Sequence, residues 1–116
     1  MLEEVPCVLK HEFGIMMVTP QSGKSYTEYE PWKYSCIYVD DDDLESVAER
    51  LTSIDLYWNT LSVKGKGLAY YGITLIPPCS LKAFIDVIAD FPELYELKEL
   101  LEKALDKNKW VIHYGI

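Results

Sequence analysis

The sequence predicts an α+β or α/β domain in which about three helices pack on one mixed β-sheet. Short runs of β-branched and aromatic residues alternate with segments of helical periodicity, and polar turn residues separate them. The 116 residues are 49% hydrophobic and 26% charged, as in ordinary globular domains. Because no internal repeat or linker divides the chain, we expect residues 1–116 to form a single domain with one main core.

The N-terminal third of the chain predicts strands separated by a long loop. Val5 to Thr19 contains two apolar runs, which predict one interrupted strand or two short strands around Gly14. Thr19 to Trp32 is rich in proline, serine and glycine, which is typical of a surface loop, and it also carries several aromatic side chains. Tyr34 to Val39 then predicts a strand that ends where a run of four aspartates begins.

A helix is expected directly after this aspartate run. Its apolar face is formed by Leu44, Val47, Ala48 and Leu51. We expect Asp42 to be the N-cap, with Glu45 at the third helical position of a capping box. Two interpretations of residues 54–61 stay open, because their apolar spacing fits a continued helix while residues 56–58 equally fit the start of a strand.

The middle of the chain predicts a turn, a strand and a helix in succession. Lys64 to Gly67 is expected to be a turn, and Leu68 to Ile76 is rich enough in β-branched and aromatic residues to predict a central strand. Ser80 is expected to cap a helix that buries Leu81, Phe84 and Ile85. Asp90 and Glu93 fit a second capping box, which predicts the start of another helix.

The C-terminal helix is the most regular element of the sequence. Its apolar stripe is formed by Leu94, Leu97, Leu100, Leu101, Ala104 and Leu105. Asn108 is placed to end this helix, since asparagine tolerates the left-handed backbone conformation of many helix ends. Trp110 to Tyr114 then predicts a last strand.

Charge and composition exclude several classes of function. The formal net charge of −8 disfavours nucleic-acid binding, because a phosphate backbone would be repelled. The apolar runs are too short for a membrane-spanning helix, and the acidic N-terminus does not resemble a secretory signal, so we expect a cytoplasmic protein without a membrane partner. Cys7, Cys36 and Cys79 form no C-x-x-C pair, which favours reduced thiols.

Acids and aromatic rings together predict a binding site for a basic protein. Residues 40–55 carry seven acids and one base, more than one helix cap needs, and the alternative is a solvated acidic face. Tyrosine and tryptophan dominate binding hot spots, although many of these rings could instead fill the core. We expect the partner to contact Asp40, Asp41, Asp42, Asp43, Glu45, Glu49, Tyr29 and Trp32. No catalytic residue, metal site or cofactor is predicted.

Other functional patterns in the sequence are weaker. Gly23-Lys24-Ser25 resembles the end of a phosphate-binding loop, but Val18 stands where the first glycine is needed, so we expect a turn. One alternative function is a small metal- or ligand-binding enzyme in which His113 acts with Cys79 or the aspartates. A second alternative is a structural protein that forms homo-oligomers.

In its general character the chain resembles the small acidic immunity proteins with which bacteria block their own toxins, among them barstar-like inhibitors. The resemblance is carried by the acidic segment Asp40 to Asp55, the aromatic loop Tyr26 to Trp32 and the closing helix and strand in Leu94 to Ile116. It implies a non-enzymatic protein that covers the active site of a basic toxin domain.

Overall fold

The structure is a computed structural model, and it describes residues 9–115. The described chain forms one six-stranded sheet of order β2-β1-β6-β5-β3-β4, in which every neighbouring pair is antiparallel. The strands are β1 (Lys10–Met16), β2 (Ile37–Asp40), β3 (Asp55–Trp58), β4 (Lys64–Lys66), β5 (Ile73–Ile76) and β6 (Trp110–Tyr114). The helices are α1 (Asp41–Leu51), α2 (Pro78–Ile88) and α3 (Tyr95–Asp106), with short 3-10 turns η1 (Pro31–Lys33) and η2 (Pro92–Leu94). The predicted class of one sheet with three helices is confirmed, and the antiparallel pairing makes it α+β.

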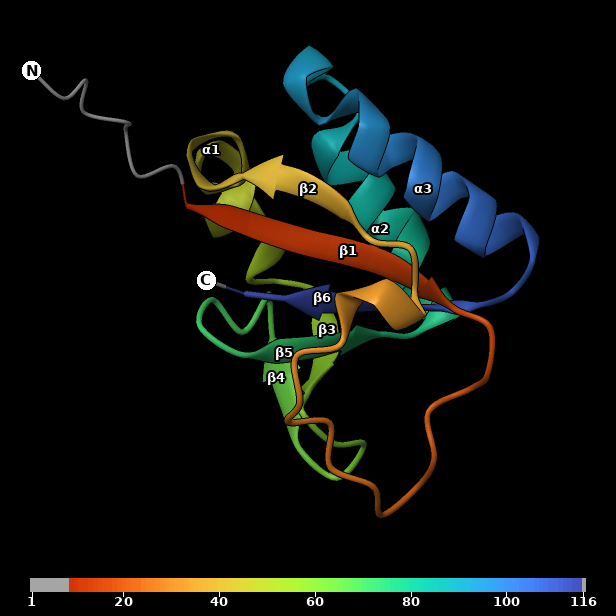
Figure 1. Cartoon of the computed structure of the whole chain (residues 1–116). Coiled ribbons are helices and arrows are strands. Elements are labelled where there is room, and N and C mark those ends of the chain that lie inside the picture. The colour runs from red at the N-terminus through yellow and green to blue at the C-terminus, as the bar shows by residue number, and fades with distance from the viewer. Residues whose placement is uncertain (1–8, 116) are drawn as a thin grey trace, which may run out of the picture.

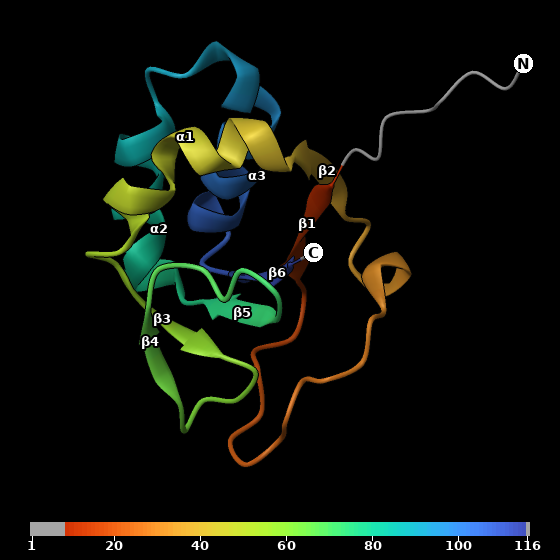
Figure 2. The same ribbon diagram turned by 90° about the vertical axis from the view of Figure 1, so that its left-hand side faces the viewer.

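The two faces of the sheet are covered differently. Figure 2 shows α1, α2 and α3 together on one side of the strands, while the long loop between β1 and β2 runs on the other. The main core lies under the helices and includes Phe13, Leu56, Phe84 and Leu101. A smaller apolar cluster on the opposite face is formed by Met16, Ile73, Leu75, Ile112 and Tyr114, with Tyr26 and Tyr34 of the loop packed against it. The aromatic loop therefore closes the second face of the sheet.

The centre of the sheet is formed by strands from opposite ends of the chain (Figure 1). β1 pairs with β6 from Glu12 opposite Tyr114 to Met16 opposite Trp110. β2 pairs with β1 only as far as Phe13 opposite Ile37, so the last three residues of β1 have a ladder partner on one side alone.

The C-terminal helix and strand form as predicted. α3 buries Leu97, Leu101 and Ala104, and Asn108 adopts a positive φ of 54° directly after the helix. The Lys109 N–H donates to the Ala104 carbonyl and the Asn108 N–H to the Leu105 carbonyl, which is the hydrogen-bond pattern of a Schellman motif. β6 spans the residues expected for the last strand.

Several predicted boundaries and caps are wrong. The N-cap of α1 is Asp40, two residues before the expected Asp42, and none of the α-helices has a side-chain cap hydrogen bond. Ser80 lies inside α2, where its hydroxyl donates to the Asp55 carbonyl and so ties the helix to β3. The box expected at Asp90 and Glu93 is replaced by the 3-10 turn η2.

Two glycine-containing segments also differ from prediction. Lys64 to Lys66 is the edge strand β4, which pairs with β3, and not a turn. A Cβ on Gly65 would lie 2.2 Å from the indole ring of Trp58, so this position of the strand needs glycine. Residues 68–72 form a loop, so the interior strand β5 begins only at Ile73. The open question about residues 54–61 is answered by β3, which pairs with both β4 and β5. Of the first predicted strand, residues 5–8 lie outside the described residues.

Candidate functional site

Three buried polar side chains form a row across the middle of the sheet, on its helix-covered face. His11 of β1, His113 of β6 and Thr74 of β5 are each 0% exposed. His11 Nδ1 lies 2.8 Å from His113 Nε2, and His113 Nδ1 lies 3.1 Å from Thr74 Oγ1. Beyond His11 the row ends on α1, where Asp41 Oδ1 lies 2.9 Å from His11 Nε2.

The hydrogen bonds of this row have one consistent direction. The Ala69 N–H donates to Thr74 Oγ1 over 2.8 Å, which leaves the Thr74 hydroxyl proton for His113 Nδ1. The tautomers that satisfy the row have His113 donate from Nε2 to His11 Nδ1 and His11 donate from Nε2 to the Asp41 carboxylate. In these tautomers every donor meets an acceptor. The row is therefore satisfied without a bound proton or ion.

Burial determines the protonation state of His113. Desolvation, with a smaller contribution from the neighbouring His11, lowers the pKa of His113 well below its usual value of 6.5. Both ring nitrogens of His113 are already hydrogen-bonded, so neither is free for the metal-assisted site proposed with Cys79. Cys79 itself is exposed on α2, and burial raises the pKa of the Cys36 thiol to about 12.

We expect the protein to lose stability as the pH falls below 6.5. The unfolded chain binds a proton at His113 near pH 6.5, whereas the folded chain does not until a lower pH. The free energy of unfolding should therefore fall by up to about 1.4 kcal/mol per pH unit below pH 6.5. Urea unfolding between pH 7.5 and 5.5 measures this slope, and His113→Gln should reduce it. Equal slopes for the two proteins would contradict the prediction, because the remaining groups, among them His11 and Asp41, are common to both.

Asp41 joins the buried row to the surface. Its Oδ1 atom also accepts a hydrogen bond from the Tyr70 hydroxyl, and the Tyr70 ring packs edge-on against His11 at 5.0 Å between centroids. The neighbouring Tyr71 packs against Tyr70 at 5.1 Å, and its side chain is 79% exposed. The Tyr70 hydroxyl thus links the loop between β4 and β5 to the start of α1, and the exposed Tyr71 ring lies beside Tyr70 in this loop.

The acids around Asp41 form an exposed cluster. Carboxylate oxygens of Asp41, Asp42 and Glu45 lie within 4.8 Å of one another, and Asp42 and Glu45 are exposed. Within residues 9–115, no lysine or arginine forms an ion pair with Asp40, Asp42, Asp43, Glu45 or Glu49. Desolvation, followed by the negative charges of Asp40, Glu93 and Asp42, raises the pKa of Asp43. We call Asp40, Asp42, Asp43, Glu45 and Tyr71 the α1 patch.

The structure brings together some of the predicted site residues and separates others. Asp40 to Asp43 and Glu45 share the first turns of α1, but Asp41 is turned inward to His11, and Glu49 lies one turn further along the helix. Tyr29 lies on the opposite face of the sheet, where its hydroxyl donates to the buried Glu12, and this hydrogen bond raises the pKa of Tyr29 to about 12. Trp32 is 70% exposed in η1, within the same loop as Tyr29.

Sequence reasoning missed three residues of this site. Tyr70 and Tyr71 fall within the predicted strand Leu68 to Ile76, and His11 falls within the first predicted strand region, Val5 to Thr19. An available signal was the alternation of β1, which places His11 and the core residue Phe13 on one face. The predicted turn at Gly23 is present, with a positive φ of 83°, and residues 24–30 after it contain no helix.

Comparison with protein-family models, with curated proteins and with solved structures found no match for this chain. No helix among residues 9–115 is both long enough and apolar enough to cross a membrane.

Proposed function

We propose that this chain is a non-enzymatic binding protein that holds a basic protein partner against the α1 patch. The observation that carries the proposal is the cluster of carboxylates at the start of α1, which has no cationic partner within the described residues. One carboxylate of the cluster, Asp41, is fixed by its hydrogen bonds to His11 and Tyr70. A surface built in this way keeps its charges close together before any partner arrives.

Like charges held this close weaken the folded state. The positive end of the α1 dipole offsets part of the repulsion, and each acid in the first turn gains about 0.3–1 kcal/mol from it. Asp43 shows that the offset is incomplete, because desolvation and its acidic neighbours still raise its pKa. Lysine or arginine side chains of a partner would remove the remaining repulsion. They would also be attracted from a distance, which increases the rate of association.

Tyr71 adds the apolar contact that charge alone does not supply. A tyrosine buries a large area on binding and loses little conformational entropy, and the contact between Tyr71 and Tyr70 already restricts this ring. An arginine can also stack on a tyrosine ring, so the same cationic partner would be recognised twice. The α1 patch therefore combines steering charges with a preformed aromatic contact.

We further propose that the partner is a toxin domain, as the resemblance to acidic immunity proteins implies. An immunity protein must bind before its toxin acts, which requires rapid association with a basic surface. The α1 patch suits this requirement, because exposed and uncompensated carboxylates steer a cationic protein toward them. In this role the chain would act by covering the active site of the toxin and would need no catalytic residue of its own.

Charge reversal in the α1 patch should weaken the partner complex by at least about tenfold, which is about 1.4 kcal/mol. The wild-type chain is immobilised to retain its partner from a lysate of the source cells, and the retained protein is identified and purified. Calorimetry then compares its affinity for the wild type and for the double variant Asp42→Lys with Glu45→Lys. We expect a basic partner, and an affinity that falls as salt rises.

A matched control carries the same change in net charge elsewhere. Asp86→Lys with Asp90→Lys alters exposed acids at the end of α2 and in the turn after it, outside the α1 patch. This variant should bind within about twofold of the wild type. An acidic partner, the absence of any retained protein, or an equal loss in both double variants would each contradict the proposal. Sedimentation of the purified chain alone measures its oligomeric state and so shows whether it binds to itself in the absence of a partner.

A further inference from the structure

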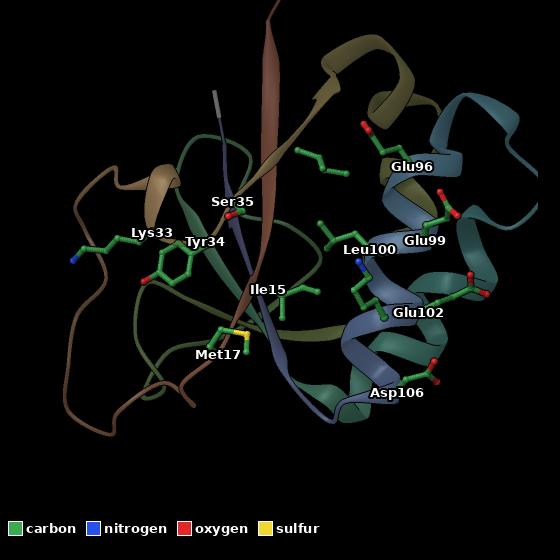
Figure 3. A pocket seen from close by; sticks show the side chains of 12 residues that line it. Ile15, Met17, Lys33, Tyr34, Ser35, Glu96, Glu99, Leu100, Glu102 and Asp106 are labelled. Carbon is green, nitrogen blue, oxygen red and sulfur yellow. The ribbon is translucent and has the colours of Figure 1, made fainter.

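A second surface of the molecule is a groove between α3 and the edge of the sheet. It has a volume of about 720 Å³, and residues of β1, η1, β2 and α3 line it. Ile15, Ile37 and Leu100 give it an apolar floor. Figure 3 shows Ile15 of β1 and Leu100 of α3 extending into the space between these two elements. The groove and the α1 patch have no residue in common.

One wall of the groove is strongly acidic. Four acids of α3 line it, namely Glu96, Glu99, Glu102 and Asp106, and Figure 3 shows the carboxylates of Glu99, Glu102 and Asp106 directed away from β1, along the outer rim of α3. They span eleven residues of the helix, from Glu96 to Asp106, and ten rises of 1.5 Å give a row about 15 Å long. Of these four, Glu102 alone has an ion pair within the described residues, and that pair is a long one of 3.9 Å with Lys98.

Two lysines also line the groove, and they do not neutralise its wall. Lys33 is paired with Glu30 at 2.8 Å, and Figure 3 shows it directed away from α3. Lys103 belongs to α3 itself and is one base beside four acids. The wall therefore keeps a negative potential above an apolar floor, a combination that matches a segment carrying both basic and apolar side chains.

The floor of the groove crosses an open edge of the sheet. The Leu9 carbonyl accepts a hydrogen bond from the Asp41 N–H, so odd-numbered residues of β1 direct their backbone groups toward β2. Ile15 continues this alternation, but the chain opposite it leaves the ladder at Ser35, whose φ is 49°. Within the described residues no backbone hydrogen bond joins Ser35 to Ile15. The N–H and C=O of Ile15 therefore face a stretch of the β1 edge that the β2 ladder does not cover.

We propose that this groove binds an extended, lysine- or arginine-rich segment of a partner protein. The segment pairs with Ile15 at the open edge of β1, as in strand addition to other sheets. Alternate side chains of an extended chain lie on opposite faces, so its basic side chains reach the acids of α3 while apolar ones rest on Leu100 and Ile37. A second copy of this chain is a poor occupant, since its net charge is also −8.

The test uses a synthetic peptide of eight residues that alternates lysine and valine, capped at both ends. Its extended length of about 26 Å covers the acidic row of α3. Nitrogen-15 NMR titration of the full chain should give saturable shifts at Ile15 and along α3. Affinity should fall at least tenfold in Glu99→Lys with Glu102→Lys, and at least fivefold for a peptide in which glycine replaces valine.

The control variant separates this inference from the proposed function. Asp42→Lys with Glu45→Lys makes the same charge change on the α1 patch and should alter peptide affinity less than twofold. Thermal unfolding verifies that both double variants are folded. If Glu99→Lys with Glu102→Lys is not folded, Glu99→Gln with Glu102→Gln takes its place. Absent binding, shifts confined to α1 and Tyr71, or equal losses in both variants would overturn the groove proposal. None of these outcomes decides whether the protein partner binds at the α1 patch.

Discussion

Replacement of His113 by alanine should lower the free energy of unfolding by about 3–5 kcal/mol. The imidazole is fully buried and packs against the Phe13 ring at 4.8 Å between centroids. Its removal leaves a cavity and also leaves His11 Nδ1 and the Thr74 hydroxyl without their partners. Each unsatisfied buried group costs about 1–3 kcal/mol. Urea unfolding followed by tryptophan fluorescence measures the change.

Two further variants separate packing from hydrogen bonding at this position. His113→Phe retains an aromatic ring and removes the polar contacts, so we expect it to lose less stability than the alanine variant. Thr74→Val removes the hydroxyl while preserving the shape of the side chain. If Thr74 and His113 act as one network, His113→Phe with Thr74→Val should lower the free energy of unfolding by about 1 kcal/mol less than the sum of the two single variants. Additive losses, or an alanine variant within 1 kcal/mol of the wild type, would show that the row contributes little.

Gly14→Ala should destabilise the fold by about 2–3 kcal/mol. A Cβ at this position of β1 would lie 2.6 Å from Tyr34 Cβ, 2.7 Å from Cys36 Sγ and 2.8 Å from the Tyr34 carbonyl oxygen. Two of these atoms are backbone or directly attached to it, so the segment at residues 34–36 must move as a whole. The lower entropy of the unfolded alanine chain offsets at most about 1 kcal/mol. Chemical unfolding of both proteins gives the difference directly.

Gly72→Ala is the matched control for this substitution. There a Cβ would meet its nearest neighbours at 3.6 Å, which is ordinary van der Waals contact, and the residue has no positive φ. We expect a loss below about 1 kcal/mol at this position. Similar losses for the two alanine variants would mean that the close approach of Tyr34 to β1 does not determine the packing of this loop.

Elements whose signals are local could be predicted from the sequence. α3 has an unbroken apolar stripe and an asparagine at its end, and both features act within a few turns of the helix. β6 follows as a compact run of β-forming residues and is confirmed over its full length. The acidic character of the start of α1 could likewise be predicted, because it depends on consecutive residues.

Features that depend on distant parts of the chain could not be predicted. The expected turn at Lys64 to Gly67 is instead largely the strand β4, which pairs with β3 and leaves the space above Gly65 to the Trp58 ring. Asp41 points inward because of a histidine 30 residues away, and that histidine bonds a second one 102 residues further along. Propensity and periodicity describe near neighbours, so neither indicates that these side chains meet.

The position of β6 between β1 and β5 constrains how the chain acquires its structure. β6 is made last, yet it separates β1 and β2 from the remaining strands. During synthesis on a ribosome the helices can begin to form, while the sheet stays in two halves until residues 110–114 emerge. Such long-range pairing slows folding and leaves strand edges exposed in the meantime. We therefore expect this chain to complete its fold more slowly than a helical bundle of equal length.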